Sequence, residues 1–82
     1  MTMAKTELSP ENFALQMQFQ LAYVTPGTRV KINKGEAKGL DGIIQFALPS
    51  AKGVVFGVKV LDKAYKSYGI TLWYEDFEVI NN

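Results

Sequence analysis

The chain lacks the side chains on which most enzymatic chemistry depends. Its 82 residues include no His and no Cys, so the commonest general base and transition-metal ligand and the thiolate nucleophile are missing. The most closely spaced acidic residues in the sequence are Glu75, Asp76 and Glu78. Carboxylates without a His make a poor transition-metal site, and neighbouring side chains on a strand diverge. We therefore expect a non-catalytic protein with no metal site and no cofactor.

A second group of residues, basic and aromatic, is suited to binding. From Gly27 to Lys66 the chain carries eight Lys and Arg against three Asp and Glu, and the remainder carries one against five. Mobile cations meet phosphates, and aromatic rings stack on unpaired bases. Solvated loop lysines and aromatic rings that cover the end of a domain explain the same pattern without a ligand. The candidate nucleic-acid or partner-binding residues are Arg29, Lys34, Lys38, Lys63, Tyr65, Lys66, Tyr68 and Trp73.

The composition predicts one small folded domain. Hydrophobic residues make up 48% of the chain and charged residues 21%, which excludes an intrinsically disordered protein. A mass of 9.1 kDa leaves room for a single core. No apolar run reaches the roughly 18 residues of a membrane helix, and the N-terminus lacks the apolar core of a signal peptide. We therefore expect a cytoplasmic protein without a membrane partner.

The N-terminal segment alternates large apolar residues with small or polar ones. On a strand the large side chains would share one face, which favours a long strand over residues 13–24. Gln, Ala, Leu and Met prefer helices, so a helix is the alternative. Residues 1–12 are expected to be a flexible lead-in, with a helical turn starting at Ser9-Pro10. Such a strand must cover the domain or pair with a second copy. The predicted homo-oligomer interface is Phe13, Leu15, Met17, Phe19, Leu21 and Tyr23.

The rest of the chain reads as short strands separated by turns. Thr25-Pro26-Gly27-Thr28 predicts a tight turn with a positive φ at its glycine. A 3₁₀ turn is expected at residues 75–77. The expected strands lie near residues 29–33, 43–48, 54–60, 70–74 and 78–80, and in the second of them Ile44, Phe46 and Leu48 are expected on one face. These indicate an all-β barrel of five to six short antiparallel strands, preceded by the long strand over residues 13–24, in a single domain, residues 13–82.

One stretch resembles a known motif. The run from Gly27 to Ile44, GTRVKINKGEAKGLDGII, looks like a KOW motif, in which apolar residues alternate and glycines recur at fixed places. Gly35 and Gly39 are expected to let the loop reverse, and Gly42 to permit a strained entry into the next strand. The resemblance implies a small SH3-like barrel of the KOW type. In that family, the barrel binds RNA or protein through its loops.

Taken together, the sequence predicts a non-catalytic binding module for RNA or a nucleoprotein complex. The alternative is a protein–protein adaptor or accessory subunit that forms a homo-oligomer through the N-terminal strand. A more remote alternative is an oligomeric pore-type enzyme similar to the type II dihydrofolate reductases. Residues 70–74 read Ile-Thr-Leu-Trp-Tyr, without the Val-Gln-Ile-Tyr run that lines the pore in that family.

Overall fold

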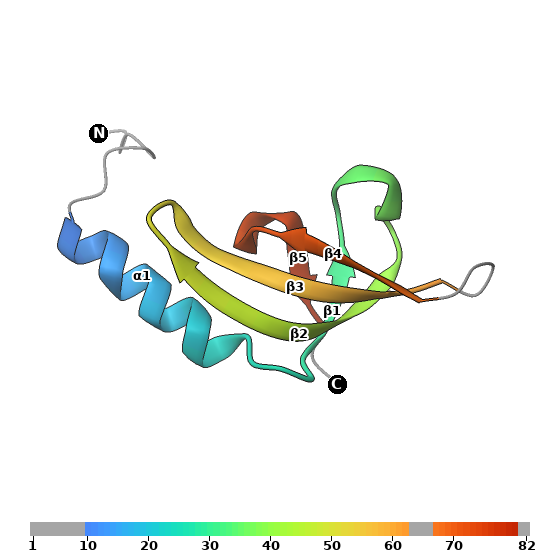
Figure 1. The fold of residues 1–82 in the computed structure, drawn as a ribbon, viewed down its shortest axis with the longest axis horizontal. Coiled ribbons are helices and arrows are strands. Elements are labelled where there is room, and N and C mark those ends of the chain that lie inside the picture. Colours follow the sequence, from blue (N-terminus) through green and yellow to red (C-terminus); the bar gives the residue numbers. More distant parts are fainter. Residues whose placement is uncertain (1–9, 63–66, 81–82) are drawn as a thin grey trace.

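The computed structural model describes residues 10–62 and 67–80. Within them lie one short helix, five strands and two 3₁₀ turns (Figure 1). Lys63, Tyr65 and Lys66, which were among the predicted binding residues, lie outside the described residues. The elements in chain order are α1 (Pro10–Tyr23), β1 (Arg29–Ile32), η1 (Gly35–Ala37), β2 (Asp41–Ser50), β3 (Gly53–Leu61), β4 (Tyr68–Leu72), η2 (Tyr74–Asp76) and β5 (Phe77–Val79).

The strands form a single antiparallel sheet in the order β4-β3-β2-β1-β5. The two ends of this order, β4 and β5, are not paired with each other in the described part of the chain. The protein is therefore a small β-rich domain with an open sheet, where the sequence led us to expect a closed barrel. Within residues 10–62 and 67–80, no helix is long and apolar enough to cross a membrane.

The core lies on one face of the sheet, here called the inner face. Alternate residues of β3 are buried there, namely Val54, Phe56, Val58 and Val60, as their alternation predicts. Val30 and Ile32 of β1 are also fully buried. Phe77 of β5 meets the ring of Phe56 edge-on, with the ring centroids 5.2 Å apart. The alternating valines and isoleucines thus predicted correctly which face of each of these strands is buried.

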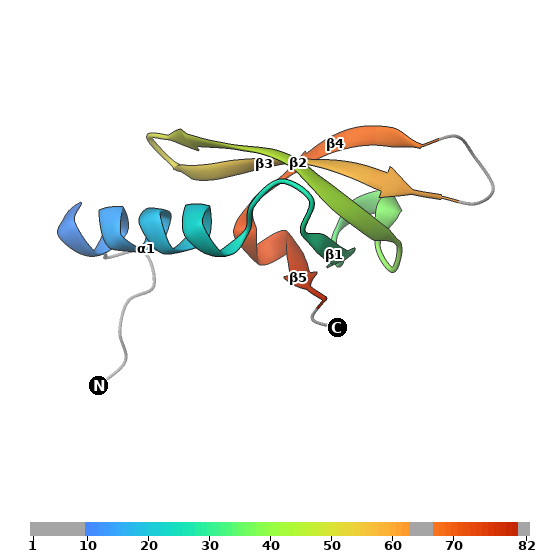
Figure 2. The same cartoon turned by 90° about the horizontal axis from the view of Figure 1, so that it is seen from below.

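The prediction of a strand over residues 13–24 is wrong. This segment forms the helix α1, which was the alternative. The helix starts at Pro10, where a helical turn was expected, because proline fits the first helical position. Met17, Leu21 and Val24 recur every three or four residues and pack on the core. Helix preference and this buried face outweigh the alternation. Figure 2 shows α1 and β5 on the same side of the β2–β3 hairpin.

A β-bulge in β2 overturns a second expectation. The pairing of β2 with β3 shifts between Ile44, which faces Val58, and Phe46, which faces Gly57. The extra residue moves the following side chains to the opposite face of the strand. Phe46 and Leu48 are therefore 42% and 57% exposed, whereas Ile44 is buried. These three residues were expected on one face, and that prediction is wrong.

Two glycines show why the chain turns where it does. Gly27 has φ of 95°, and the Thr28 N–H donates to the Thr25 carbonyl at 3.0 Å, which is the predicted turn. Gly42 plays a different part from the one expected, because its φ is not positive. A Cβ there would lie 2.5 Å from the Val58 Cγ1, so close packing of β2 on β3 requires this glycine.

Candidate binding surfaces

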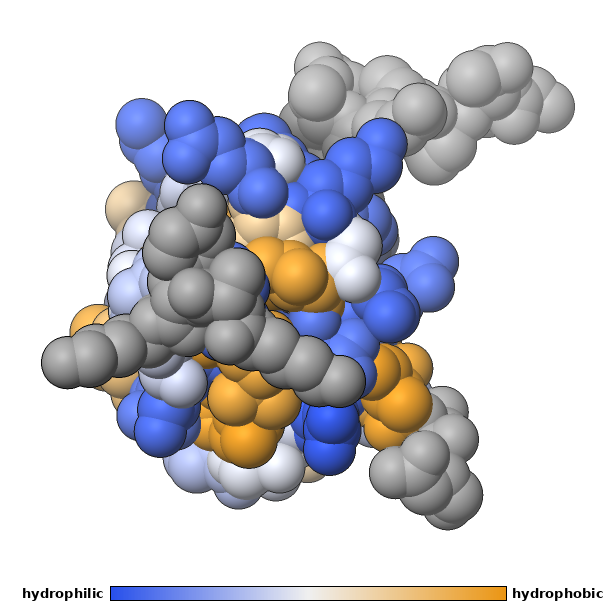
Figure 3. Space-filling view, turned by 90° about the vertical axis from the view of Figure 1, so that its right-hand side faces the viewer, coloured by the Kyte–Doolittle hydropathy of each residue, from blue (hydrophilic) through white to orange (hydrophobic). Residues whose placement is uncertain are grey.

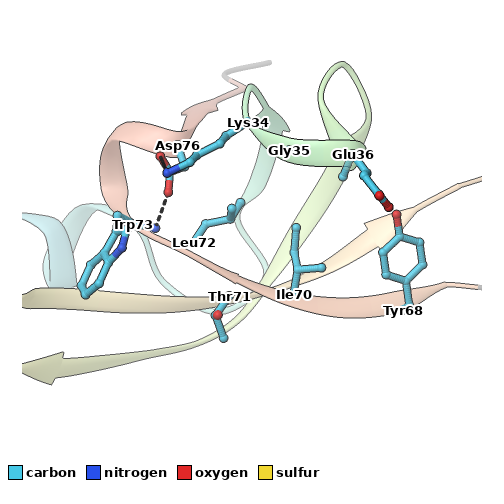
Figure 4. Close-up of a pocket in the computed structure, with 10 residues that line it drawn as sticks. Lys34, Gly35, Glu36, Tyr68, Ile70, Thr71, Leu72, Trp73 and Asp76 are labelled. Carbon is cyan, nitrogen blue, oxygen red and sulfur yellow. Dashed lines mark hydrogen bonds and ion pairs between the residues drawn. The ribbon is translucent and has the colours of Figure 1, made fainter.

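A hollow, called here the β4 hollow, lies along the edge of β4 that is not paired with β3. Its volume is about 420 Å³. Ile70 and Leu72 point from β4 toward η1, whereas Thr71 points the other way and Tyr68 points toward Glu36 (Figure 4). The end of the molecule that carries η1 shows hydrophobic surface between hydrophilic side chains (Figure 3). The hollow is lined by Lys34, Gly35, Glu36, Ala37, Tyr68, Ile70, Thr71, Leu72, Trp73 and Asp76.

Asp76 holds the walls of this hollow together. Its side chain is almost fully buried, and its Oδ2 accepts a hydrogen bond of 3.0 Å from the Trp73 N–H. Its Oδ1 lies 3.7 Å from the Nζ of Lys34, which precedes η1. Buried carboxylates need such partners to be tolerated. Asp76 therefore fixes the start of η2 and ties it to the η1 loop across the hollow.

The charges around the β4 hollow do not favour a phosphate. Among residues 10–62 and 67–80, its lining carries one cation, Lys34, and two carboxylates, Glu36 and Asp76. The cation already lies beside one of these carboxylates. An anionic ligand would therefore meet a net negative rim. An apolar ligand with a positive charge fits this lining better.

A second surface is the outer face of the sheet, opposite the core. Arg29, Lys31 and Lys59 alternate with buried residues of β1 and β3, which directs them to this face. The register places Arg29 and Lys59 on either side of Ile43 in β2. Phe46 lies on the same face over Gly57, where a Cβ would overlap its ring. No described element covers this face of the hairpin (Figure 2).

Carboxylates offset part of the positive charge on the outer face. Asp41 Oδ1 lies 3.0 Å from the Lys31 Nζ, and its Oδ2 lies 3.3 Å from the Arg29 Nη2. The Lys31 ammonium is the main cause that lowers the pKa of Asp41 below its ordinary value; partial burial opposes the shift and Arg29 adds to it. A further hollow of about 790 Å³ here is lined by Arg29, Lys31, Asp41 and also Asp62.

The structure thus separates the residues that the sequence grouped as one binding site. Lys34, Tyr68 and Trp73 meet at the β4 hollow, whereas Arg29 lies on the outer face. Trp73 is half-buried beside the β2–β3 turn, 3.8 Å from the place of a Cβ at Gly53, so it also covers that end of the core. Lys38 is exposed after η1 and does not line the β4 hollow.

Sequence reasoning missed several residues of these surfaces. Lys31 and Lys59 could have been found, because each alternates with buried valines or isoleucines on its strand. Phe46 was expected on the same face as Ile44, since nothing in the residue types shows the bulge before it. Ile70, Leu72 and Glu36 could not be predicted as site residues, because they meet only where η1 folds beside the unpaired edge of β4.

The predicted oligomer interface is divided by the helix. Met17 and Leu21 pack on the core and Phe13 is half-buried, so these three do not form an outward face. Leu15, Phe19 and Tyr23 are spaced four residues apart and remain exposed. The rings of Phe19 and Tyr23 stack with centroids 5.4 Å apart. Only this second group can meet another molecule.

Among the described residues no group of three or more His, Cys, Asp or Glu is placed to hold a metal ion. Comparison of the chain with models of protein families, with curated proteins and with solved structures finds no match.

Proposed function

We propose that this protein is a non-catalytic binding module with an SH3-like barrel of the KOW type, and that its ligand is a segment of a partner protein. The strand order, with β5 beside β1 and a 3₁₀ turn leading into β5, supports this relationship. The positive φ angles of Gly35 and Gly39, in the loop that resembles a KOW motif, support it as well. The partner site is the β4 hollow.

The lining of the β4 hollow is the observation that carries this proposal. Tyr68 and Ile70 offer an exposed aromatic and a half-buried aliphatic side chain along one strand, with the buried Leu72 and the half-buried Trp73 at its end. Small-molecule and peptide sites combine such apolar surface with a few polar groups that set orientation. Here the polar groups are Glu36, Lys34 and Asp76. Their summed charge is negative, so they repel a phosphate.

The test compares two substitutions on neighbouring residues of β4. Ile70→Glu places a charge in the hollow. Thr71 also borders the hollow, but its side chain points away from it, so Thr71→Glu places the same charge on the outer face (Figure 4). The tagged protein is used to capture partners from a nuclease-treated lysate of its own source organism. We expect Ile70→Glu to lose partners that the unmodified protein and Thr71→Glu retain. Tyr68→Ala, at an exposed position, provides a second variant if thermal unfolding shows that Ile70→Glu has lost its fold.

Two results would contradict the proposal. One is that nuclease treatment removes every partner, because a protein ligand does not depend on RNA. The other is that Ile70→Glu, Tyr68→Ala and Thr71→Glu all recover the same partners as the unmodified protein, which would place the binding surface elsewhere.

Single-stranded RNA on the outer face is the second candidate function. Two observations favour it. Arg29 and Lys59 lie in one row across the sheet, on either side of Ile43. The exposed ring of Phe46 lies beside Gly57, two residues before Lys59 on β3. One stacked base contributes about 1–3 kcal/mol. Three phosphates neutralised by Arg29, Lys31 and Lys59 would give a salt slope of about −2.

Binding of a labelled oligouridine at low salt tests this second candidate. Lys59→Gln should weaken binding, Asp41→Asn should strengthen it by removing a negative charge, and Lys52→Gln on the β2–β3 turn should have little effect. Equal affinity for all three variants, or no binding at low salt, would exclude the outer face as an RNA site.

A further inference from the structure

The outer edge of β4 is free to pair with another strand. β4 is hydrogen-bonded to β3 on one side and stands at the end of the sheet. In an antiparallel strand every second residue turns its N–H and C=O away from its partner. Among the described residues, none of these groups of β4 forms a backbone hydrogen bond outside the β3 pairing. The edge therefore offers a row of donors and acceptors.

This edge also lacks the protection that exposed strand edges usually carry. Proteins discourage unwanted pairing with prolines, charged residues, bulges or very short edge strands. β4 reads Tyr-Gly-Ile-Thr-Leu, with no proline and no charge, and its pairing with β3 is regular. The opposite edge, β5, has only three residues and carries Glu78. The contrast singles out β4 as the edge that remains open.

The β4 hollow lies beside this edge on the inner face. A strand added next to β4 would lie about 4.8 Å from it and would point alternate side chains to the same face as Tyr68, Ile70 and Leu72. Tyr68 and Ile70 give the added side chains an apolar surface, whereas Leu72 and Ala37 belong to the buried core. On the other side of the hollow, Lys34 is paired with Asp76, so Glu36 is the charged residue at the rim that has no ion pair among the described residues.

We propose that the β4 edge binds an extended peptide segment of a partner protein by strand addition. Its apolar side chains enter the β4 hollow, and a Lys or Arg lies beside Glu36. Main-chain hydrogen bonds to the edge supply affinity, and the hollow supplies selectivity for alternate side chains. The proposal rests on the proposed function, because it specifies the form and charge of the ligand at the same site.

The experiment uses a synthetic peptide of alternating valine and lysine, added to the isotope-labelled full chain and followed by amide NMR shifts. A matched peptide of alternating valine and glutamate tests the charge preference. We expect saturable shifts at residues 68–72 and 35–37 with the lysine peptide and at least several-fold weaker binding of the glutamate peptide. Glu36→Lys should remove this preference, whereas Glu78→Lys, the same charge change on β5, should not.

Backbone methylation of the peptide then tests strand pairing directly. An added strand uses the N–H groups of alternate residues only, so methylation at one parity should abolish binding, while methylation at the other parity should leave it nearly unchanged. Equal effects at the two parities, or no shifts on β4 at millimolar peptide, would overturn strand addition. If the peptide causes no shifts on β4, the lysate experiment distinguishes the two proposals. Partners that Ile70→Glu loses would still support the proposed function, whereas partners that Ile70→Glu retains would contradict both the proposed function and strand addition.

Discussion

At the scale of single residues, Asp41 is the charged group whose behaviour is best defined. Both of its oxygens face a cation, Lys31 on one side and Arg29 on the other. The lowered pKa of Asp41 follows mainly from Lys31. A carboxyl whose pKa is lower in the folded state stabilises the fold above its unfolded pKa, and this contribution disappears as the pH falls through the folded pKa.

The first prediction concerns the pH dependence of stability. Asp41→Asn should unfold at lower urea concentration than the unmodified protein at neutral pH, because Lys31 and Arg29 lose their counter-charge. The difference should shrink below about pH 4, where the carboxyl starts to take up a proton in the unfolded chain. Urea midpoints of both proteins across this range provide the measurement. A difference that stays constant down to the acid limit would show that the ion pairs do not cause it.

At the scale of elements, the bulge in β2 decides which aromatic residues belong to the core. Phe56 is fully buried, whereas Phe46 is half-exposed over Gly57. Phe56→Ala should cost about 3–5 kcal/mol or abolish folding, and Phe46→Ala should cost only about 1 kcal/mol. Equal costs for the two substitutions, measured by urea unfolding, would contradict the observed register.

Gly57 offers an independent check on the same bulge. Gly57→Ala should cost about 1–3 kcal/mol, because the new methyl group overlaps the ring of Phe46. In a Phe46→Ala background the same change should be nearly neutral, since the ring is gone. A double-mutant cycle measures this coupling. The same cost in both backgrounds would mean that Phe46 does not lie over Gly57.

The helix α1 leads to a prediction about self-association. Leu15, Phe19 and Tyr23 are spaced four residues apart and exposed, and such a stripe can pair with the same stripe of a second copy. We expect light scattering to give a mass above that of one chain at tens of micromolar. Replacing these three residues with Gln should restore the mass of a single chain, while Gln18→Ala on the same helix should not. A monomeric unmodified protein would exclude an interface on α1.

Most of the strands, but not the helix or the bulge, could be predicted from the sequence. The strands β1, β3, β4 and β5 and the turn η2 were predicted near their observed places, because apolar residues alternate with polar ones between turns. The last three are shifted: β4 was expected at residues 70–74 and lies at Tyr68–Leu72, η2 was expected at 75–77 and lies at Tyr74–Asp76, and β5 was expected at 78–80 and lies at Phe77–Val79. The segment 13–24 was not, since its alternating residues also include a set spaced for a helix, and packing on the core decides between them. The bulge at Ile44/Phe46 leaves no mark on residue types.

The candidate site was only partly predictable for a similar reason. Lys34, Tyr68 and Trp73 were singled out as binding residues and do meet at the β4 hollow. Their expected ligand was RNA, because the sequence shows the lysines but not the carboxylates that the fold brings beside them. Asp76 is 42 residues after Lys34 in the chain, and only the pairing of β1 with β5 brings the two together.

At the scale of the whole molecule, the two faces of the sheet carry different chemistry. The inner face carries the apolar core. The outer face bears Arg29, Lys31 and Lys59, and it also bears Asp41 and Glu78, which the register places opposite Lys31. The β4 hollow lies at the open edge between β4 and the η1 and η2 turns, and this is where we propose that the partner protein binds.

Site-specific photo-crosslinking in a nuclease-treated lysate tests this placement most directly. A photoreactive phenylalanine analogue replaces Tyr68, which lines the β4 hollow, or Glu78, on the exposed face of β5, so that Glu36 is kept in both variants. We expect a discrete protein adduct from position 68 that persists after nuclease treatment and is much weaker from position 78. Adducts that vanish with nuclease, or that form equally from both positions, would contradict it.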